Sequence, residues 1–259
     1  MRHRSARSGE ALRREALRGE VTRGEVTRAK LPRRRHWWRW ILEGVAALVV
    51  LAVAVTAIVV KLTPGPAPLA LPKDAAAPSG PLDGTWRVTT GSVAGFRVRE
   101  TIIGFSNDVT GRTSDVTGTV VIADDQVVRA MFRVSLDAIT VDGKARQPQL
   151  VRSLDVTAHP VATVTLTRPV PLPAAFSSGG TVTLTAAATL TLSGTTRPVT
   201  VTLSARRDGT AIETAGSLPV AFADFGVTGP SGYGVLGSLA SNGTAEFLLI
   251  LRSRAGRGA

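Results

Sequence analysis

The stretch Thr183–Ala205 reads TLTAAATLTLSGTTRPVTVTLSA and decides the fold class. From Leu184 to Leu192 every second residue is apolar, and threonine takes most of the positions between them. The same alternation resumes after Gly194–Pro198 and continues to the end of the stretch. Because successive side chains of a strand point to opposite faces, this pattern predicts two half-buried strands with Gly194–Pro198 as the corner between them.

Further strand-like runs lie on both sides of this pair. They are rich in Val, Thr, Leu and aromatic residues, and they cover residues 85–88, 95–101, 116–122, 127–136, 161–167, 216–222 and 244–251. Asp124-Asp125 separates two of the runs as a hairpin turn, and residues 146–155 predict one short helix. About eight antiparallel strands predict a sandwich or a barrel. Long strands with one polar face favour the closed barrel, because closure leaves no exposed strand edge.

Small residues on the apolar face bear on what such a barrel contains. Ala186 and Ala188 take two adjacent apolar positions of the first strand of the pair. Side chains of this size leave space inside a barrel rather than fill it, whereas the alternation alone is equally consistent with a packed core. The sequence therefore leaves a hollow barrel and a filled barrel open.

The positive charge is concentrated at the N-terminus. The whole chain of 259 residues has a formal net charge of +12, and residues 1–40 hold 13 Lys and Arg against 4 Glu. We expect this arm to be a disordered basic segment, and residues 253–259 to form a short basic tail. The rest of the chain has no basic stripe with interleaved aromatic residues, which argues against binding of nucleic acid.

Residues 41–61 predict a membrane anchor. From Gly44 to Val60 the sequence has no charged residue, and a helix of about 20 apolar residues spans roughly 30 Å, the thickness of the hydrocarbon core. Four arginines between residues 33 and 39 precede the run, so the positive-inside rule predicts a cytoplasmic N-terminus and an extracytoplasmic C-terminal part at the plasma membrane. A cleaved leader is the alternative, but Pro78 directly after the small residues 75–77 disfavours cleavage there.

Residues 62–82 predict a linker. Six prolines lie between Leu62 and Pro81, with alanine and glycine among much of the remainder. Such a composition is typical of an extended, semi-rigid spacer. We therefore expect a domain at residues 83–252 that stands away from the membrane on this spacer.

The residues that usually perform catalysis or bind metals are scarce in this domain. The chain has no cysteine, and His159, directly before Pro160, is the one histidine after the anchor. No Gly-x-Ser-x-Gly elbow is present, and Asp124-Asp125 fits a solvated turn better than an acid–base pair. We expect no catalytic residue, no metal site and no cofactor; a hydrolase that uses His159 as its base is the minor alternative.

Several short motifs follow one another along residues 83–252. Trp86, Ser92 and Phe96 come first, followed by VTGTVVI at 116–122, HPVATVTL at 159–166, LTLSGTTRPVTVTL at 190–203 and DFG at 224–226. Together these motifs resemble the YceI-like family of polyisoprenoid-binding, lipocalin-like barrels. Two positions depart from the family pattern: Gly91 stands before Ser92 where a histidine is usual, and Gln147 stands where an aspartate is frequent.

The resemblance implies an eight-stranded antiparallel barrel around an elongated apolar pocket. The implied ligand is a long isoprenoid, such as a polyprenol or quinone, or a similar amphiphile. The alternative is a closed barrel that acts as a structural or interaction module of the cell envelope. The side chains that we expect to line the pocket are Trp86, Phe96, Val98, Phe132, Val134, Val164, Leu166, Leu190, Val201, Phe222 and Phe225.

Overall fold

The structure is a computed structural model of the whole chain, and it describes residues 37–62, 66–102, 105–141, 144–145, 148–227 and 237–253. The chain divides between residues 54 and 55, and all of the β-structure belongs to the second part. The N-terminal arm at residues 1–36 and the tail beyond residue 253 lie outside the described residues, as does Gln147.

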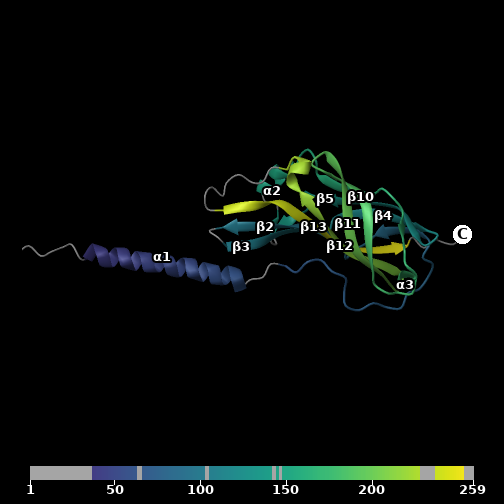
Figure 1. Cartoon of the computed structure of the whole chain (residues 1–259), viewed down its shortest axis with the longest axis horizontal. Helices are drawn as coiled ribbons and strands as arrows, with labels where there is room; N and C mark the ends of the chain where they lie inside the picture. The colour runs from purple at the N-terminus through teal and green to yellow at the C-terminus, as the bar shows by residue number, and fades with distance from the viewer. Residues whose placement is uncertain are drawn as a thin grey trace, which may run out of the picture. The chain divides into compact units, whose positions relative to one another are not determined.

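The first element is the helix α1, Trp37–Leu62 (Figure 1). It includes the predicted apolar segment, residues 41–61, and its described side chains, from Ile41 to Val55, are exposed. Within the described part of the chain, no helix is both long enough and apolar enough to cross a membrane. The helix is thus confirmed, and its insertion into a membrane stays a prediction.

The remainder of the chain is almost entirely antiparallel β-structure. Three short helical segments interrupt it: α2 (Pro148–Ser153), α3 (Ala174–Ser177) and the 3₁₀ helix η1 (Phe222–Phe225). The long strands are β1 (Gly84–Val88), β2 (Val93–Ile102), β3 (Phe105–Thr113), β4 (Val116–Ala123), β5 (Gln126–Ser135), β8 (Val161–Leu166), β10 (Val182–Leu192), β11 (Thr195–Asp208), β12 (Ala211–Ala221) and β13 (Gly237–Ser253). The short strands are β6 (Thr140–Val141), β7 (Lys144–Ala145) and β9 (Val170–Pro171).

The strands close into a barrel (Figure 1). Neighbours follow the order β1-β4-β5-β8-β10-β11-β12-β13, and β13 pairs again with β1, which completes a ring of eight strands. β1 and β2 both pair with β13, β1 with residues 251–253 and β2 with residues 237–248. β3 pairs with β2, and β4, the next strand in the sequence, pairs with β1. The predicted eight-stranded antiparallel barrel is confirmed for the described residues. The one short helix predicted at residues 146–155 corresponds to α2, and the structure adds α3 and η1.

The hairpin of β10 and β11 carries the motif that opened the sequence analysis. Eleven residue pairs run in register from Val182↔Ala205 to Leu192↔Thr195. The turn between the strands is shorter than the predicted corner, because Ser193 and Gly194 alone, with φ of 49° and 74°, make it. Pro198 is therefore a strand residue and lies opposite Thr189 of β10. On the other side of β11, pairing with β12 begins only at Thr202, so no strand there needs the N–H that Pro198 lacks.

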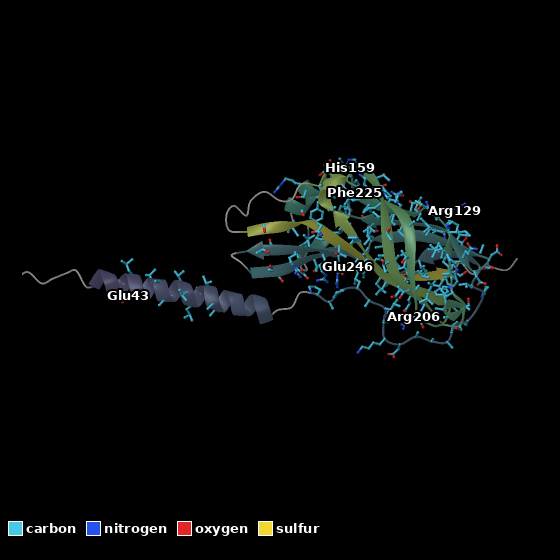
Figure 2. The ribbon with its side chains drawn as sticks, in the orientation of Figure 1. Glu43, Arg129, His159, Arg206, Phe225 and Glu246 are labelled. Atoms are coloured by element: carbon cyan, nitrogen blue, oxygen red, sulfur yellow. The ribbon has the colours of Figure 1, made fainter. Side chains whose placement is uncertain are left out.

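Residues 66–82, the described part of the linker predicted at residues 62–82, lie along the barrel instead of extending away from it. This segment, which we call the strap, is hydrogen-bonded to the outer wall of the barrel at several points along its length. Arginine side chains on the wall donate to strap carbonyl groups, and carbonyl acceptors stay available in a proline-rich segment because it forms no internal hydrogen bonds. Figure 2 labels two residues of that wall, Arg206 and Glu246.

Candidate functional site

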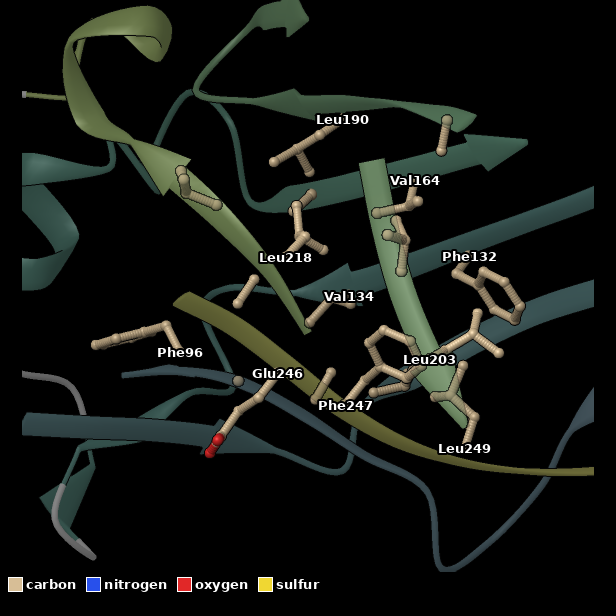
Figure 3. Close-up of a pocket in the computed structure, with 18 of the residues that line it drawn as sticks. Phe96, Phe132, Val134, Val164, Leu190, Leu203, Leu218, Glu246, Phe247 and Leu249 are labelled. Atoms are coloured by element: carbon tan, nitrogen blue, oxygen red, sulfur yellow. The ribbon is translucent and has the colours of Figure 1, made fainter. Parts of the chain in front are cut away.

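The barrel encloses one large apolar cavity. Its volume is about 360 Å³, and its lining comes from almost every strand of the ring. Leu190, Val164, Leu203 and Leu218 surround it in the close-up, together with Phe247 (Figure 3). A space of this size falls within the range of small-molecule binding sites, so the barrel is hollow rather than packed shut.

The two ends of the cavity differ. Trp86 and Phe176, each only 1% exposed, pack with Leu172 and Leu251 and close the end where β1 begins. At the other end lie the last residues of β2, the first residues of β3 and η1, and the lining side chains there, such as Phe222 and Leu239, are partly exposed. We call these the closed end and the mouth end.

Three phenylalanines of the cavity wall leave the centre of the cavity open because each lies over a glycine. In the strand register Phe96 is opposite Gly111, Phe132 is opposite Gly118 and Phe247 is opposite Gly216. A Cβ atom on each of these glycines would come within 2.3, 2.4 and 2.7 Å of the facing ring. The rings thus occupy the space that a side chain on the neighbouring strand would take, and they lie against the wall instead of crossing the cavity.

Nine of the eleven side chains that the sequence analysis named lie on the cavity wall. Trp86 and Phe225 do not. Trp86 belongs to the cluster at the closed end and donates its indole N–H to the carbonyl of Leu82 at 2.9 Å. Phe225 is buried beneath η1 in the main core. Those on the wall are Phe96, Val98, Phe132, Val134, Val164, Leu166, Leu190, Val201 and Phe222; their contact with a lipid stays a prediction.

The structure adds wall residues that the sequence analysis did not name. Many lie on β12 and β13, where Leu218, Phe247 and Leu249 face inward. The run FLLIL at 247–251 is apolar at every position, so it carries no alternation from which the inward face can be read. The inward phase follows only from the pairing of β12 with β13, which places Gly216 opposite Phe247.

The charged residues near the cavity point away from it. Glu246 contributes to the wall, but its carboxylate turns outward (Figure 3). There it accepts a hydrogen bond from Arg112 at 3.0 Å and lies 3.6 Å from the guanidinium of Arg97. Glu246 is 5% exposed, so two arginines compensate one buried carboxylate on the outer face of the barrel.

The remaining polar candidates have structural positions. The Ser92 hydroxyl accepts the N–H of Ile250 at 2.9 Å and so joins the break between β1 and β2 to β13. The backbone N–H of His159 donates to the backbone carbonyl of Asp155 at 2.8 Å, and the His159 ring lies against Gly194 in the β10–β11 turn. Neither residue lines the cavity, and within the described residues no three His, Cys, Asp or Glu side chains are grouped to bind a metal ion.

A closed antiparallel barrel with an internal apolar cavity defines the class of this protein. Within that class, the chain belongs to the family of YceI-like domains, whose family model matches residues 86–245. The sequence-based resemblance is confirmed.

Two solved structures illustrate the likeness. A polyisoprenoid-binding domain from Saccharophagus degradans is 18% identical, with a TM-score of 0.51 over 65% of this chain and 98% of that one. BcnA from Burkholderia cenocepacia is 16% identical, with a TM-score of 0.45 over 61% and 95% of the two chains. No curated protein matches the chain.

Proposed function

We propose that this protein binds a long-chain isoprenoid, such as a polyprenol or quinone, or a similar amphiphile, inside the barrel and carries out no chemistry on it. The single observation that supports this is the apolar cavity of about 360 Å³. The ligand class comes from the family and from the polyisoprenoid-binding domain that shares the fold. A closed interaction module, the alternative, needs a filled interior, and the cavity disfavours it.

Burial of apolar surface supplies the affinity in this proposal. Each Å² of apolar surface removed from water contributes about 25 cal/mol, so a chain that buries about 500 Å² gains roughly 12 kcal/mol before the costs of association. No polar contact is required for this gain. The wall is accordingly built from Val, Leu, Ala and Phe side chains.

The proposal also places the barrel outside the plasma membrane, with residues 41–61 as an uncleaved anchor. The support is the sequence: an uncharged apolar run, preceded by arginines and followed by few charges. Extraction of membranes with alkaline carbonate tests the anchor, because an integral protein stays in the pellet. Protease added to intact spheroplasts should digest the barrel and leave a protected N-terminal fragment.

Lipid analysis tests the ligand directly. Residues 66–259, which keep the strap, would be secreted, purified without detergent, extracted with organic solvent and examined by mass spectrometry. An unrelated exported β-barrel protein serves as the control. A stoichiometric isoprenoid or quinone supports the carrier. An empty barrel that also fails to take up added polyprenols and quinones overturns it.

A further inference from the structure

The strap begins at the mouth end of the barrel. Pro66 and Pro68 lie beside Ser106 and Asn107, which are near the start of β3 at the tip of its hairpin with β2. The Pro66 carbonyl accepts a hydrogen bond from Arg97 at 2.7 Å.

Two partly buried arginines hold this first part of the strap in place. Arg97 and Arg112, which donate to the carbonyls of Pro66 and Ala67, are the same two arginines that compensate Glu246. The strap carbonyl groups thus accept hydrogen bonds from two guanidinium groups that are already positioned by their ion pairs with Glu246. Release of the strap would replace these two hydrogen bonds by hydrogen bonds to water.

The middle of the strap is held by a second buried ion pair. The guanidinium of Arg206 lies 2.8 Å from the carboxylate of Glu213, and both side chains are less than 10% exposed. Arg206 also donates to the carbonyl of Asp74 at 2.6 Å. This contact fixes the strap beside β11 and β12, on the way toward the closed end.

The last part of the strap is bound at the turn between β11 and β12, at the closed end. The Ala76 N–H donates to the Asp208 carboxylate at 2.6 Å, and Ser79 and Gly209 are joined by a backbone hydrogen bond of 2.9 Å. Arg207 donates to the Ser79 carbonyl at 2.8 Å. The strap therefore runs along the wall from the mouth end to the closed end.

The covalent chain limits how far the mouth end lies from the end of α1. Three residues separate Leu62, the last residue of α1, from the fixed Pro66. Four fully extended Cα–Cα steps reach at most about 14 Å. The 17 residues of the strap do not lengthen the connection between α1 and the mouth end, because they run along the wall of the barrel.

We propose that the strap orients the barrel with its mouth end against the lipid surface in which the chain is anchored, so that a lipid passes between bilayer and cavity over a short distance. This inference rests on the proposed anchor and the proposed lipid ligand. The partner that it assigns to the mouth end is the outer leaflet of the membrane. A free spacer of the same length would allow either end of the barrel to face the bilayer.

Fluorescent labels at the two ends test the orientation. The chain has no cysteine, so Ala223→Cys, in η1 at the mouth end, and Gln126→Cys, beside the β4–β5 turn at the closed end, each give one labelling site. Both positions are exposed. In full-length protein reconstituted into vesicles that contain a nitroxide-headgroup lipid, we expect the label at position 223 to be quenched and the label at position 126 to keep its emission.

An insertion tests the role of the short connection. About twelve Gly and Ser residues placed between Thr63 and Pro64 lengthen the free tether from about four to about sixteen steps and leave every strap contact intact. Effective concentration falls with roughly the 3/2 power of tether length, which predicts about an eightfold lower initial rate of loading of a fluorescent polyprenol from the same vesicles. Quenching at position 223 should fall in the same variant.

The outcomes separate the parts of the argument. Equal quenching at the two positions, stronger quenching at position 126, or no quenching at either one overturns the orientation. An unchanged loading rate after the insertion overturns the role of the short connection. If neither chain takes up polyprenol while the quenching difference is present, the orientation holds and the proposed ligand is wrong.

Discussion

The pairs of phenylalanine and glycine on the inner wall control the width of the cavity one residue at a time. Gly111 gives the cleanest test, because the three atoms nearest to a Cβ atom there all belong to side chains, two in the ring of Phe96 and one methyl group of Ile139. Gly111→Ala should push the Phe96 ring toward the centre of the cavity. We expect binding of a polyprenol to weaken by about tenfold, consistent with an overpacking cost of 1–3 kcal/mol.

A second variant isolates the cause of that loss. Gly111→Ala combined with Phe96→Leu removes the ring and returns the space, so binding measured by fluorescence titration should recover toward the wild-type affinity. If the double variant binds as weakly as Gly111→Ala alone, the ring is not responsible. Thermal unfolding of both variants shows whether the barrel is intact.

A charge on the inner wall should abolish binding. Phe132→Asp places a carboxylate in an apolar cavity where no cation faces it among the described lining residues, and burial of an unpaired charge costs several kcal/mol. Met131, the preceding residue, faces outward and is 47% exposed, so Met131→Asp is the matched control. Lipid retention is measured by mass spectrometry, and a folded Phe132→Asp protein that retains lipid at the wild-type level removes Phe132 from the binding wall.

The inner face was predictable wherever apolar and polar residues alternate. This is why the named residues of β5, β8, β10 and β11 lie on the wall. Prediction failed at Trp86 and Phe225 for a different reason: both are buried, but the sequence does not show whether an aromatic residue lines a cavity or seals its surroundings. The difference depends on contacts with distant segments, such as the bond from Trp86 to Leu82.

At the scale of elements, the β4–β5 hairpin contains a strained turn. Asp124 and Asp125 both have positive φ, 53° and 55°, which is the geometry of a type I′ turn. Glycine is strongly preferred at the second of these positions. Asp125→Gly should therefore stabilise the protein by about 0.5 kcal/mol, or a rise of roughly 1–2 °C in Tm.

The neighbouring strand residue provides the control for this turn. Gln126 begins β5, so Gln126→Gly adds flexibility where no turn requires it and should lower stability by about 0.5–1 kcal/mol. Differential scanning calorimetry measures both variants. A lower Tm for Asp125→Gly than for the wild type contradicts the turn assignment.

The strap should contribute measurably to the stability of the barrel. A chain that begins at Leu82 loses the carbonyl acceptors of Arg97, Arg112, Arg206 and Arg207. Since each such hydrogen bond contributes about 0.5–1.5 kcal/mol net, we expect this chain to be about 3 kcal/mol less stable than one that begins at Pro66. Urea unfolding compares the two chains, and coincident midpoints would show that the strap does not hold the fold.

Strands were predictable from the sequence where apolar residues alternate, and they were missed where most residues are polar or charged. β3 reads FSNDVTGRT and resembles a loop, because its outward residues are polar and bind β2 and the strap. The predicted strands also stop short of Arg206, Arg207 and Glu213, although β11 and β12 include all three. Arg206 and Arg207 donate hydrogen bonds to carbonyl groups of the strap, and no local sequence pattern indicates that contact.

At the scale of the whole molecule, the barrel gives up packing in order to stay hollow. Alanines at 186 and 188 and the glycines beneath the phenylalanine rings are the residues that create the space. A filled core of the same strands would bury more apolar surface and be more stable. Stability and ligand binding should therefore respond in opposite directions when the cavity is filled.

Ala186→Leu tests this opposition. In a hollow barrel the larger side chain enters empty space, so the lipid-free protein should be stabilised by up to about 1.5 kcal/mol while polyprenol binding weakens at least about tenfold. In a barrel packed shut, the same change overpacks the core and destabilises it by about 1–3 kcal/mol. Ala187 is adjacent and exposed, so Ala187→Leu reports the effect of leucine on β10 outside the cavity. Thermal unfolding of the lipid-free proteins measures the change in Tm of each variant. A larger rise in Tm for Ala186→Leu than for Ala187→Leu means a hollow interior that a ligand can occupy. A fall in Tm for Ala186→Leu means an interior that has no space for a ligand.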